Sequence, residues 1–306
     1  MTDFLFPTAR AAALSTRLLT ASSVERLLAA KTADESFRLL TDLAFAGPDA
    51  EIPPAENFEK YLFDALFSVK KMIFESVDSP AFLKILFLPF DLQNAKSSLS
   101  AFFRGEKYEN IRRGLSDFSF FPKRTAFEIL FEKKSGPKFF EAALFSARDF
   151  LKRNSDDFRG AERLLDAAFF AEMARNVLKF GDAAVAQFFE KRLFLENQKT
   201  FSRAKKSEKI PFLTGKISEP MILVDRDFFA VPDDFSEIDA EISLLADLFW
   251  TARIAPDSPI NVIFLFSATQ KNAEVFRILF AGKRNGLSPE RVRDAVAPFF
   301  PLFPKK

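Results

Sequence analysis

Apolar residues recur at helical spacing between Asn261 and Lys283, where Leu265, Ala268, Phe276 and Leu279 fall on one stripe. Charged side chains in the same stretch fall elsewhere on the helical wheel. This pattern predicts one long amphipathic helix.

The end of that helix and the start of the next are also marked in the sequence. Asn285-Gly286 supplies residues that end a helix in the left-handed conformation. Ser288-Pro289 supplies an N-cap followed by a first-turn proline. We therefore expect a second, shorter helix from Pro289 to Ala297.

Helical patterns continue through most of the remaining chain, which predicts an all-α protein. Ser22 with Glu25, and Thr32 with Glu35, have the spacing of capping boxes at helix starts. The exception is Ile210 to Pro232, which we expect to be loop with a short strand at Met221 to Val224. The other expected helices cover Val24 to Lys31, Asp34 to Phe45, Glu56 to Val77, Pro80 to about Gly105, Lys123 to the break at Ser135, Lys138 to Lys152, Ala161 to Phe180, Ala183 to Lys206 and Ser236 to Trp250.

Part of the sequence recurs, which indicates internal repetition. A shift of 103 residues pairs Glu59 with Glu162, Asn94 with Asn197 and Lys96 with Lys199. A third copy is centred on Glu241 and Asn272. The pattern predicts three helical repeats, residues 1–115, 116–209 and 210–306.

Asn94, Asn197 and Asn272 each lie among apolar helical neighbours, so burial is expected for all three. A buried amide must find hydrogen-bond partners or it destabilises the fold. We interpret the three as structural amides that fix how neighbouring segments meet; contact with a ligand is the alternative.

Composition narrows the chemistry that the chain can perform. Its 306 residues include no cysteine and no histidine, which excludes disulfides and thiol catalysis and removes the commonest acid/base group and metal ligand. The nine glycines form no phosphate-binding loop, and a net charge of +2 argues against nucleic acid as the main partner. We expect no cofactor, no metal and no small-molecule substrate. No segment reads as a signal peptide or as a membrane span.

Four blocks, in order, resemble a known family: Phe6–Ala30, Phe90–Glu106, Glu190–Ser218 and Lys271–Val296. The chain resembles the C subunits of the prokaryotic V-type and A-type rotary ATPases, the counterparts of the eukaryotic d subunit. Phenylalanine stands at positions such as Phe90 and Phe264, where the family often has tyrosine or histidine.

The resemblance implies a non-catalytic central-stalk subunit built from three similar helical subdomains, arranged as a funnel with pseudo-threefold symmetry. Its partners would be the central-shaft subunits D and F and the membrane rotor ring of proteolipid subunits. The chain would lie peripherally on the cytoplasmic side of the membrane and would take part in ion-translocating ATP synthesis or hydrolysis.

Two groups of basic residues are candidate interfaces with lipid headgroups or an acidic shaft subunit: Lys199, Arg203, Lys205 and Lys206, and Lys283 with Arg284. Solvated helix ends are the more common explanation of such clusters, because Lys and Arg favour helix C-termini. The acidic pairs Asp156-Asp157 and Asp233-Asp234 are expected to form caps or turns. Two alternatives for the whole chain are a helical scaffold unrelated to ATPases and a hydrolase or metal enzyme that uses only Asp and Glu.

Overall fold

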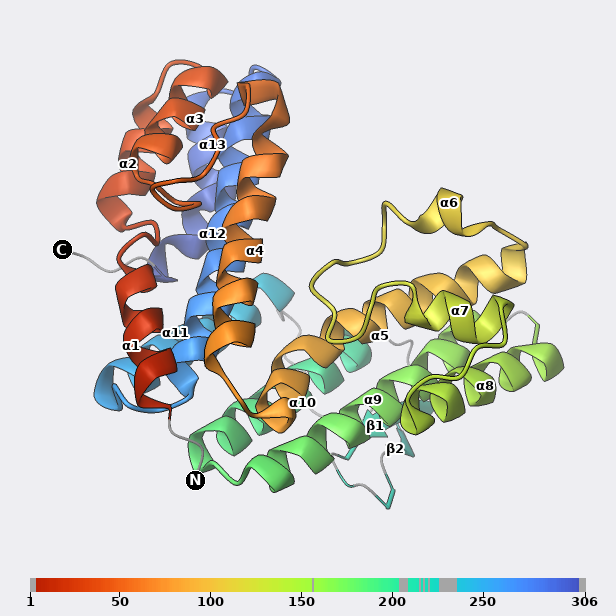
Figure 1. Cartoon of the computed structure of the whole chain (residues 1–306). Helices are drawn as coiled ribbons and strands as arrows, with labels where there is room; N and C mark the ends of the chain where they lie inside the picture. Colours follow the sequence, from red (N-terminus) through yellow and green to blue (C-terminus); the bar gives the residue numbers. More distant parts are fainter. Residues whose placement is uncertain are drawn as a thin grey trace. The chain divides into compact units, whose positions relative to one another are not determined.

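The structure is a computed structural model that describes residues 4–155, 157–203, 209–214, 216, 218–219, 221–225 and 236–302. Over these residues the regular structure is almost entirely helical, which confirms the predicted all-α class (Figure 1). The chain divides into two compact units. Unit 1 combines Met1–Asp78 with Ser236–Lys306, and unit 2 is Ser79–Phe235.

Unit 1 joins the two ends of the chain around one long helix, α12. This helix packs against α1, α3, α4, α11 and α13. The described elements of unit 1 are α1 (Leu5–Ser15), α2 (Ala21–Ala29), α3 (Ala33–Asp42), the 3-10 turn η1 (Ala55–Asn57), α4 (Phe58–Ser76), α11 (Glu237–Ile254), α12 (Ile260–Arg284), α13 (Pro289–Val296) and the 3-10 turn η3 (Ala297–Leu302).

The core of unit 1 explains why α12 is central. Its buried residues lie on nearly every side, as expected of a helix enclosed by other helices rather than covered on one face. Aromatic rings connect it to its neighbours: Phe280 stacks on Phe58 with ring centroids 4.2 Å apart, and Phe276 contacts Phe37 of α3 at 6.4 Å. Such ring pairs add to the stabilisation that burial alone provides.

Several helix ends in unit 1 follow the sequence, and the start of α2 departs from it. Thr32 caps α3, Ser288 caps α13, and Gly286 has a positive φ of 69° after α12, all as expected. The capping box expected at Ser22 and Glu25 is wrong. Thr20 caps α2 instead, because its side chain and that of Ser23 bond each other's backbone N–H, at 3.2 and 2.7 Å.

Unit 2 is organised around α5 and α9, which pack together, with α8 against α9 and α7 against α5. Phe140 and Phe169 form part of its core, with ring centroids 5.0 Å apart. Its described elements are α5 (Pro80–Arg104), α6 (Tyr108–Ile111), α7 (Thr125–Phe131), α8 (Lys138–Arg153), α9 (Phe158–Phe180), α10 (Ala183–Ser202), β1 (Lys209–Leu213) and β2 (Met221–Asp225).

The strands β1 and β2 form an antiparallel pair in which Phe212 lies opposite Ile222 and Leu213 opposite Met221. The strand expected at Met221 to Val224 is thereby confirmed. The sequence pattern does not predict its partner strand, because Lys209–Leu213 contains a proline and has too few alternating positions to indicate a strand.

The sequence contains 42 phenylalanines, and seven pairs of them are adjacent in the chain. The pairs in α9 and α10 point inward. Phe169, Phe170, Phe188 and Phe189 are all buried. The broad apolar arc that these pairs require is therefore supplied by neighbouring helices of unit 2, which accounts for part of the phenylalanine content without a partner protein.

The two units follow boundaries that differ from those of the three predicted repeats. The division at Asp78 separates α4 from α5, which the repeat pattern places in one copy. The packing pairs α9 with α5 and α4 with α12. The three-repeat division stays a prediction.

Among the described residues, no helix combines the length and apolar character that crossing a membrane requires.

Close packing of α12 against α13 generates a stability prediction. A Cβ added to Gly282 would lie 2.7 Å from Cγ2 of Val292. We expect Gly282→Ala to lower the free energy of unfolding by about 1–2 kcal/mol, although alanine favours helices. In a Val292→Ala background the obstructing methyl groups are absent, so the same change should be neutral or stabilising. Urea unfolding of the four proteins measures this coupling, and additive effects would contradict it.

Candidate functional site

Asn94, in the middle of α5, holds the backbone of a connecting segment. It is 2% exposed. Its Nδ2 donates to the carbonyl oxygen of Ser116 at 3.0 Å, and the Ser116 N–H donates to its Oδ1 at 2.7 Å. The amide thus satisfies both polar groups of one residue, as an adjacent β-strand would.

Asn197, on α10, makes the same pair of contacts with another segment. Its Nδ2 donates to the carbonyl oxygen of Leu213 at 2.9 Å, and the Leu213 N–H donates to its Oδ1 at 2.8 Å. Leu213 is the last residue of β1. Both partners are buried, so each hydrogen bond replaces water that the groups cannot reach.

Asn272, on α12, holds a segment from the opposite end of the chain. The N–H of Leu19 donates to its Oδ1 at 2.5 Å, and Leu19 lies directly before the Thr20 cap of α2. All three asparagines therefore accept a backbone N–H from a segment outside their own helix. We call these three contacts the amide clamps.

The three glutamates at matching sequence positions do not share one environment. Glu59 of α4 forms a bidentate pair with Arg277 of α12, with contacts of 2.9 to 3.0 Å. Glu241 of α11 accepts from Lys271 of α12 at 2.6 Å. Glu162, on α9, lies close enough to Asp166 for its charge to act on that carboxyl group.

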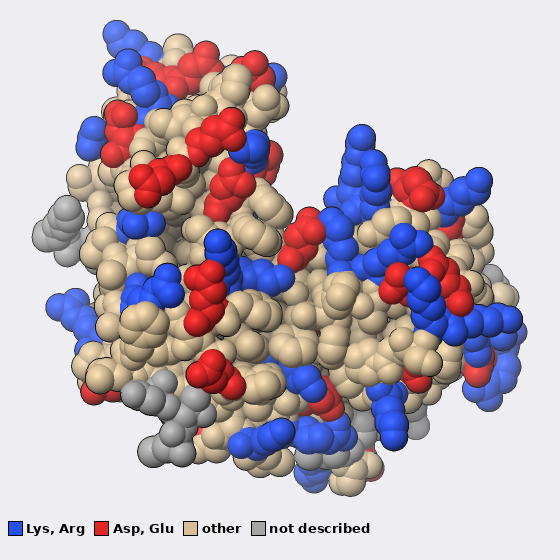
Figure 2. Space-filling model, in the orientation of Figure 1, with Lys and Arg blue, Asp and Glu red and all other residues tan. Residues whose placement is uncertain are grey.

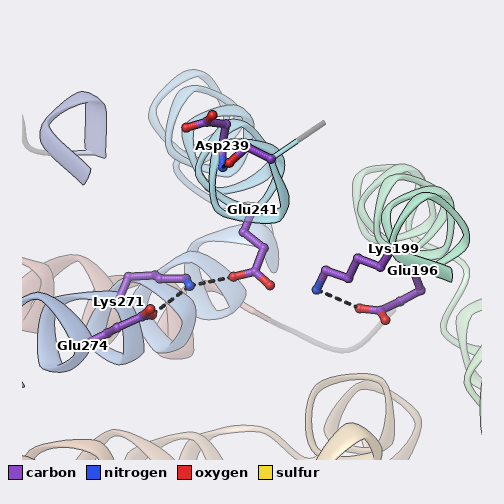
Figure 3. A network of polar contacts seen from close by, with 7 residues as sticks. Glu196, Lys199, Asp239, Glu241, Lys271 and Glu274 are labelled. Atoms are coloured by element: carbon purple, nitrogen blue, oxygen red, sulfur yellow. Dashed lines mark hydrogen bonds and ion pairs between the residues drawn. The ribbon is translucent and has the colours of Figure 1, made fainter. Parts of the chain in front are cut away.

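Lys271 joins two helices of unit 1 through carboxylates on either side. It contacts Glu241 of α11 and, at 2.8 Å, Glu274 of its own helix (Figure 3). Burial alone would lower the pKa of Lys271, but the hydrogen bonds and charges of the two glutamates outweigh burial and raise it. The lysine thus stays charged and ties α11 to α12.

The predicted basic interface residues have different surroundings. Lys199 contacts Glu196 at 3.4 Å and its side chain is only 16% exposed (Figure 3). Lys283 donates to the carbonyl oxygens of Leu28, at 2.9 Å, and Ala30, at the end of α2, and burial lowers its pKa. Arg203 and Arg284 are exposed at helix ends. Lys205 and Lys206 lie outside the described residues, and an interface role for the set stays a prediction.

A cavity of about 350 Å³ lies within unit 2 between α5, α9 and α10. Leu92, Phe170 and Met173 form its apolar side. Lys96 crosses its polar side to bind Asp166 at 2.6 Å. Burial raises the pKa of Asp166, with help from Glu196 and Glu162 and against the positive charge of Lys96.

Neither the cavity nor the acidic pairs offers a metal centre in the described part of the chain, where no three acidic side chains converge as ligands would. Asp157 caps α9 by accepting the N–H of Gly160 at 2.7 Å, as expected of a cap. Asp156, Asp233 and Asp234 lie outside the described residues.

The apolar helical pattern identifies the three asparagines but not the backbone groups that they bind. Ser116 and Leu213 lie 22 and 16 residues beyond their asparagines, and Leu19 lies 253 residues before Asn272. No side-chain signal marks these partners, because the bonded atoms belong to the backbone that every residue possesses. Only the burial of the amides made a partner necessary.

The amide clamps give a direct stability prediction. We expect Asn94→Ala and Asn197→Ala to lower the free energy of unfolding by about 2–4 kcal/mol, because each strands a buried N–H and a carbonyl. Asn272→Ala, with one clamp bond, should cost less. Asn110 is exposed, so Asn110→Ala is the control and should change stability by less than about 0.5 kcal/mol. Urea denaturation measures all four, and equal effects would contradict a special role for the clamps.

The raised pKa of Asp166 predicts an unusual pH dependence. Folding favours the protonated form of Asp166. The contribution of this group to the free energy of unfolding is therefore greatest at low pH. It is lost as the pH rises from the ordinary pKa of 3.8 through the higher pKa of the folded state. Relative to Asp166→Asn, the wild type should therefore lose stability over this rise. Glu25, whose pKa is lowered by its hydrogen bond from Arg293, should show the opposite trend relative to Glu25→Gln. Urea unfolding at several pH values tests both predictions. If the free energies of unfolding of the wild type and of Asp166→Asn change with pH in parallel, the raised pKa of Asp166 is contradicted.

Comparison with known proteins bears on the chain as a whole. The family model described as "ATP synthase (C/AC39) subunit" matches residues 7–222. A search of curated proteins found no match. The matched stretch includes Asn94 and Asn197, while the block from Lys271 to Val296 lies beyond it and stays a resemblance. Because the match covers well over half of its 306 residues, the chain belongs to the C/AC39 subunit family of the V/A-type ATP synthases.

Proposed function

We propose that this chain is a non-catalytic central-stalk subunit that connects the rotor shaft, subunits D and F, to the proteolipid ring in the membrane. The family places it in a rotary ATPase. The finer role would be to transmit torque during ion-translocating ATP synthesis or hydrolysis, from a peripheral position on the cytoplasmic side of the membrane.

The observation that carries this proposal is the threefold use of the amide clamp. A coupling subunit that surrounds a shaft needs several similar repeats arranged around a common axis. Asn94, Asn197 and Asn272 hold three segments by the same backbone contact. This recurrence supports three related repeats and a funnel with pseudo-threefold symmetry.

The order of the clamped segments also supports a closed arrangement of repeats. The first two segments follow their asparagine helices in the sequence, whereas the third comes from the N-terminus. The N-terminal segment would then take the place that a continuation of the third repeat would occupy. In that case the three repeats form a ring rather than an open array. A ring resists twisting better than an array with two free ends.

Transmission of torque also requires that helices do not slide past one another. Charged pairs reinforce apolar packing in unit 1: Arg277 of α12 holds Glu59 of α4 in a bidentate pair, and Arg293 of α13 holds Glu25 of α2 at 2.7 and 2.8 Å. Such exposed pairs contribute little to the free energy of unfolding, but two parallel hydrogen bonds in one plane fix the relative register of the two helices.

No cofactor or substrate is part of this proposal. The sequence contains no histidine and no cysteine, so it lacks the commonest acid/base group and the thiol nucleophile. The partners that we propose are proteins and the membrane ring. Among the predicted interface residues, Arg203 and Arg284 are exposed at helix ends and suit an acidic partner.

Affinity purification tests this function. A tagged copy is expressed in cells that contain the parent ATPase, membranes are solubilised in mild detergent, and the captured proteins are identified. We expect shaft subunits and proteolipid subunits to be recovered together. A tagged soluble helical protein of similar size serves as the control.

The outcome separates the candidate functions. Recovery of soluble proteins without either ATPase subunit would contradict the proposal and favour a helical scaffold. Charge reversal at Lys205 and Lys206 tests the predicted interface separately, since unchanged recovery of both partners would remove these two residues from it.

A further inference from the structure

One part of unit 2, residues 104–138, carries more net charge than the whole protein. It includes α6, α7 and their connections, and has nine Lys and Arg residues against five Asp and Glu, a net charge of +4. The complete chain has +2. Blue side chains gather over this part of the surface in Figure 2. We call residues 104–138 the basic segment.

Most acidic groups of the basic segment are already neutralised within it. Arg104 contacts Glu106 at 2.9 Å and Lys123 contacts Asp117 at 2.6 Å. The remaining pairs are formed by Arg124 and Lys134, which share Glu128 and Glu132. Four cations thus balance four carboxylates, so the excess charge must reside on the other residues.

Five cations of the segment are exposed and form no ion pair with any described residue: Lys107, Arg112, Arg113, Lys133 and Lys138. Glu109 is the only carboxylate of the segment left to oppose them. The net +4 is therefore carried by side chains that are free to contact an anionic surface. Because such charges are exposed, their attraction is long-ranged at low salt and screened at high salt.

Residues 104–138 themselves lack the exposed apolar centre that protein interfaces usually have. Every large hydrophobic side chain found exposed in the described chain lies outside residues 104–138. The aromatic rings of the segment pack on one another instead: Phe131 stacks on Phe127 at 4.0 Å and contacts Phe102 at 5.1 Å. A charged surface without exposed apolar groups suits headgroups better than a folded protein.

Nucleic acid fits the same surface less well than a membrane does. Proteins that bind single strands present aromatic rings on which bases stack. Tyr108 is the polar aromatic of the segment, and its ring is occupied by Phe127 at 5.3 Å and by the Arg124 guanidinium at 4.7 Å. The free cations therefore have no open stacking platform between them.

We infer that the basic segment docks on anionic lipid headgroups, with Lys107, Arg112 and Arg113 as the main contacts. The contact would hold this end of unit 2 to the membrane surface directly. It goes beyond the proposed function, because it requires neither the proteolipid ring nor the shaft. Attraction to an anionic leaflet is worth about fivefold in affinity for each basic residue near the surface.

Vesicle sedimentation of the full chain tests this inference. The purified protein is mixed with vesicles of phosphatidylcholine alone or with about one third phosphatidylserine, a fraction chosen to give an anionic surface. We expect binding to the anionic vesicles only, and a loss of about a hundredfold in affinity for Lys107→Gln/Arg112→Gln/Arg113→Gln. Raised salt should weaken binding of the wild type.

A matched control changes the same amount of charge elsewhere. Arg26, Lys31 and Arg38 of unit 1 are exposed and form no ion pair with a described residue. Arg26→Gln/Lys31→Gln/Arg38→Gln should bind like the wild type. Because all six residues are exposed, both triple variants should unfold at the same urea concentration as the wild type.

Three results would overturn the inference: equal binding to neutral vesicles, equal loss in the two triple variants, or complete displacement by a short DNA duplex at matched phosphate concentration. None of them would alter recovery of shaft and ring subunits in the affinity purification. The failure of lipid docking and the failure of the proposed function are therefore distinguishable.

Discussion

The fold depends on buried amides that satisfy the backbone of segments which cannot satisfy themselves. A connection between helices has no regular partner for its N–H and carbonyl groups, and burying them unpaired destabilises a protein by about 1–3 kcal/mol per group. Asn94 and Asn197 meet this requirement with two bonds each, and Asn272 with one. A leucine at any of these positions would fill the space but leave the connection without a partner.

This constraint explains which features were predictable from the sequence. Helix spacing and most helix ends follow from local chemistry: Thr32, Ser288 and Gly286 act where the pattern places them. The buried asparagines were recognisable because polar residues interrupted apolar stripes. Their partners were not, since a backbone N–H carries no sequence label and Leu19 lies 253 residues from Asn272. The cap of α2 was misplaced because Thr20 and Ser23 compete with Ser22 for the same helix start.

The sequence also does not reveal which basic residues are paired in the folded protein. Their position in basic clusters makes Lys199 and Lys283 candidate interface residues. In the structure Lys199 contacts Glu196, and Lys283 caps the end of α2 through the carbonyl oxygens of Leu28 and Ala30. Lys107 and Arg113 did not stand out in the sequence, because acidic residues are interspersed with them. The geometry of ion pairing decides which cations remain without a carboxylate partner. Composition gives only the net charge.

The N-terminal helices of unit 1 are held by residues from the C-terminal part of the chain. Its helices pack on α12 and α4, and Leu19 gives its N–H to Asn272. Arg293 and Lys283, near the end of the chain, bind Glu25 and the carbonyls at the end of α2. The last long helix, α12, is therefore completed by residues that are synthesised before it. Contacts between such distant parts of a chain carry a large loop-closure entropy, and unit 1 can form them only after α12 has been made. Unit 2 draws its contacts from one continuous stretch, so it is the unit expected to fold first.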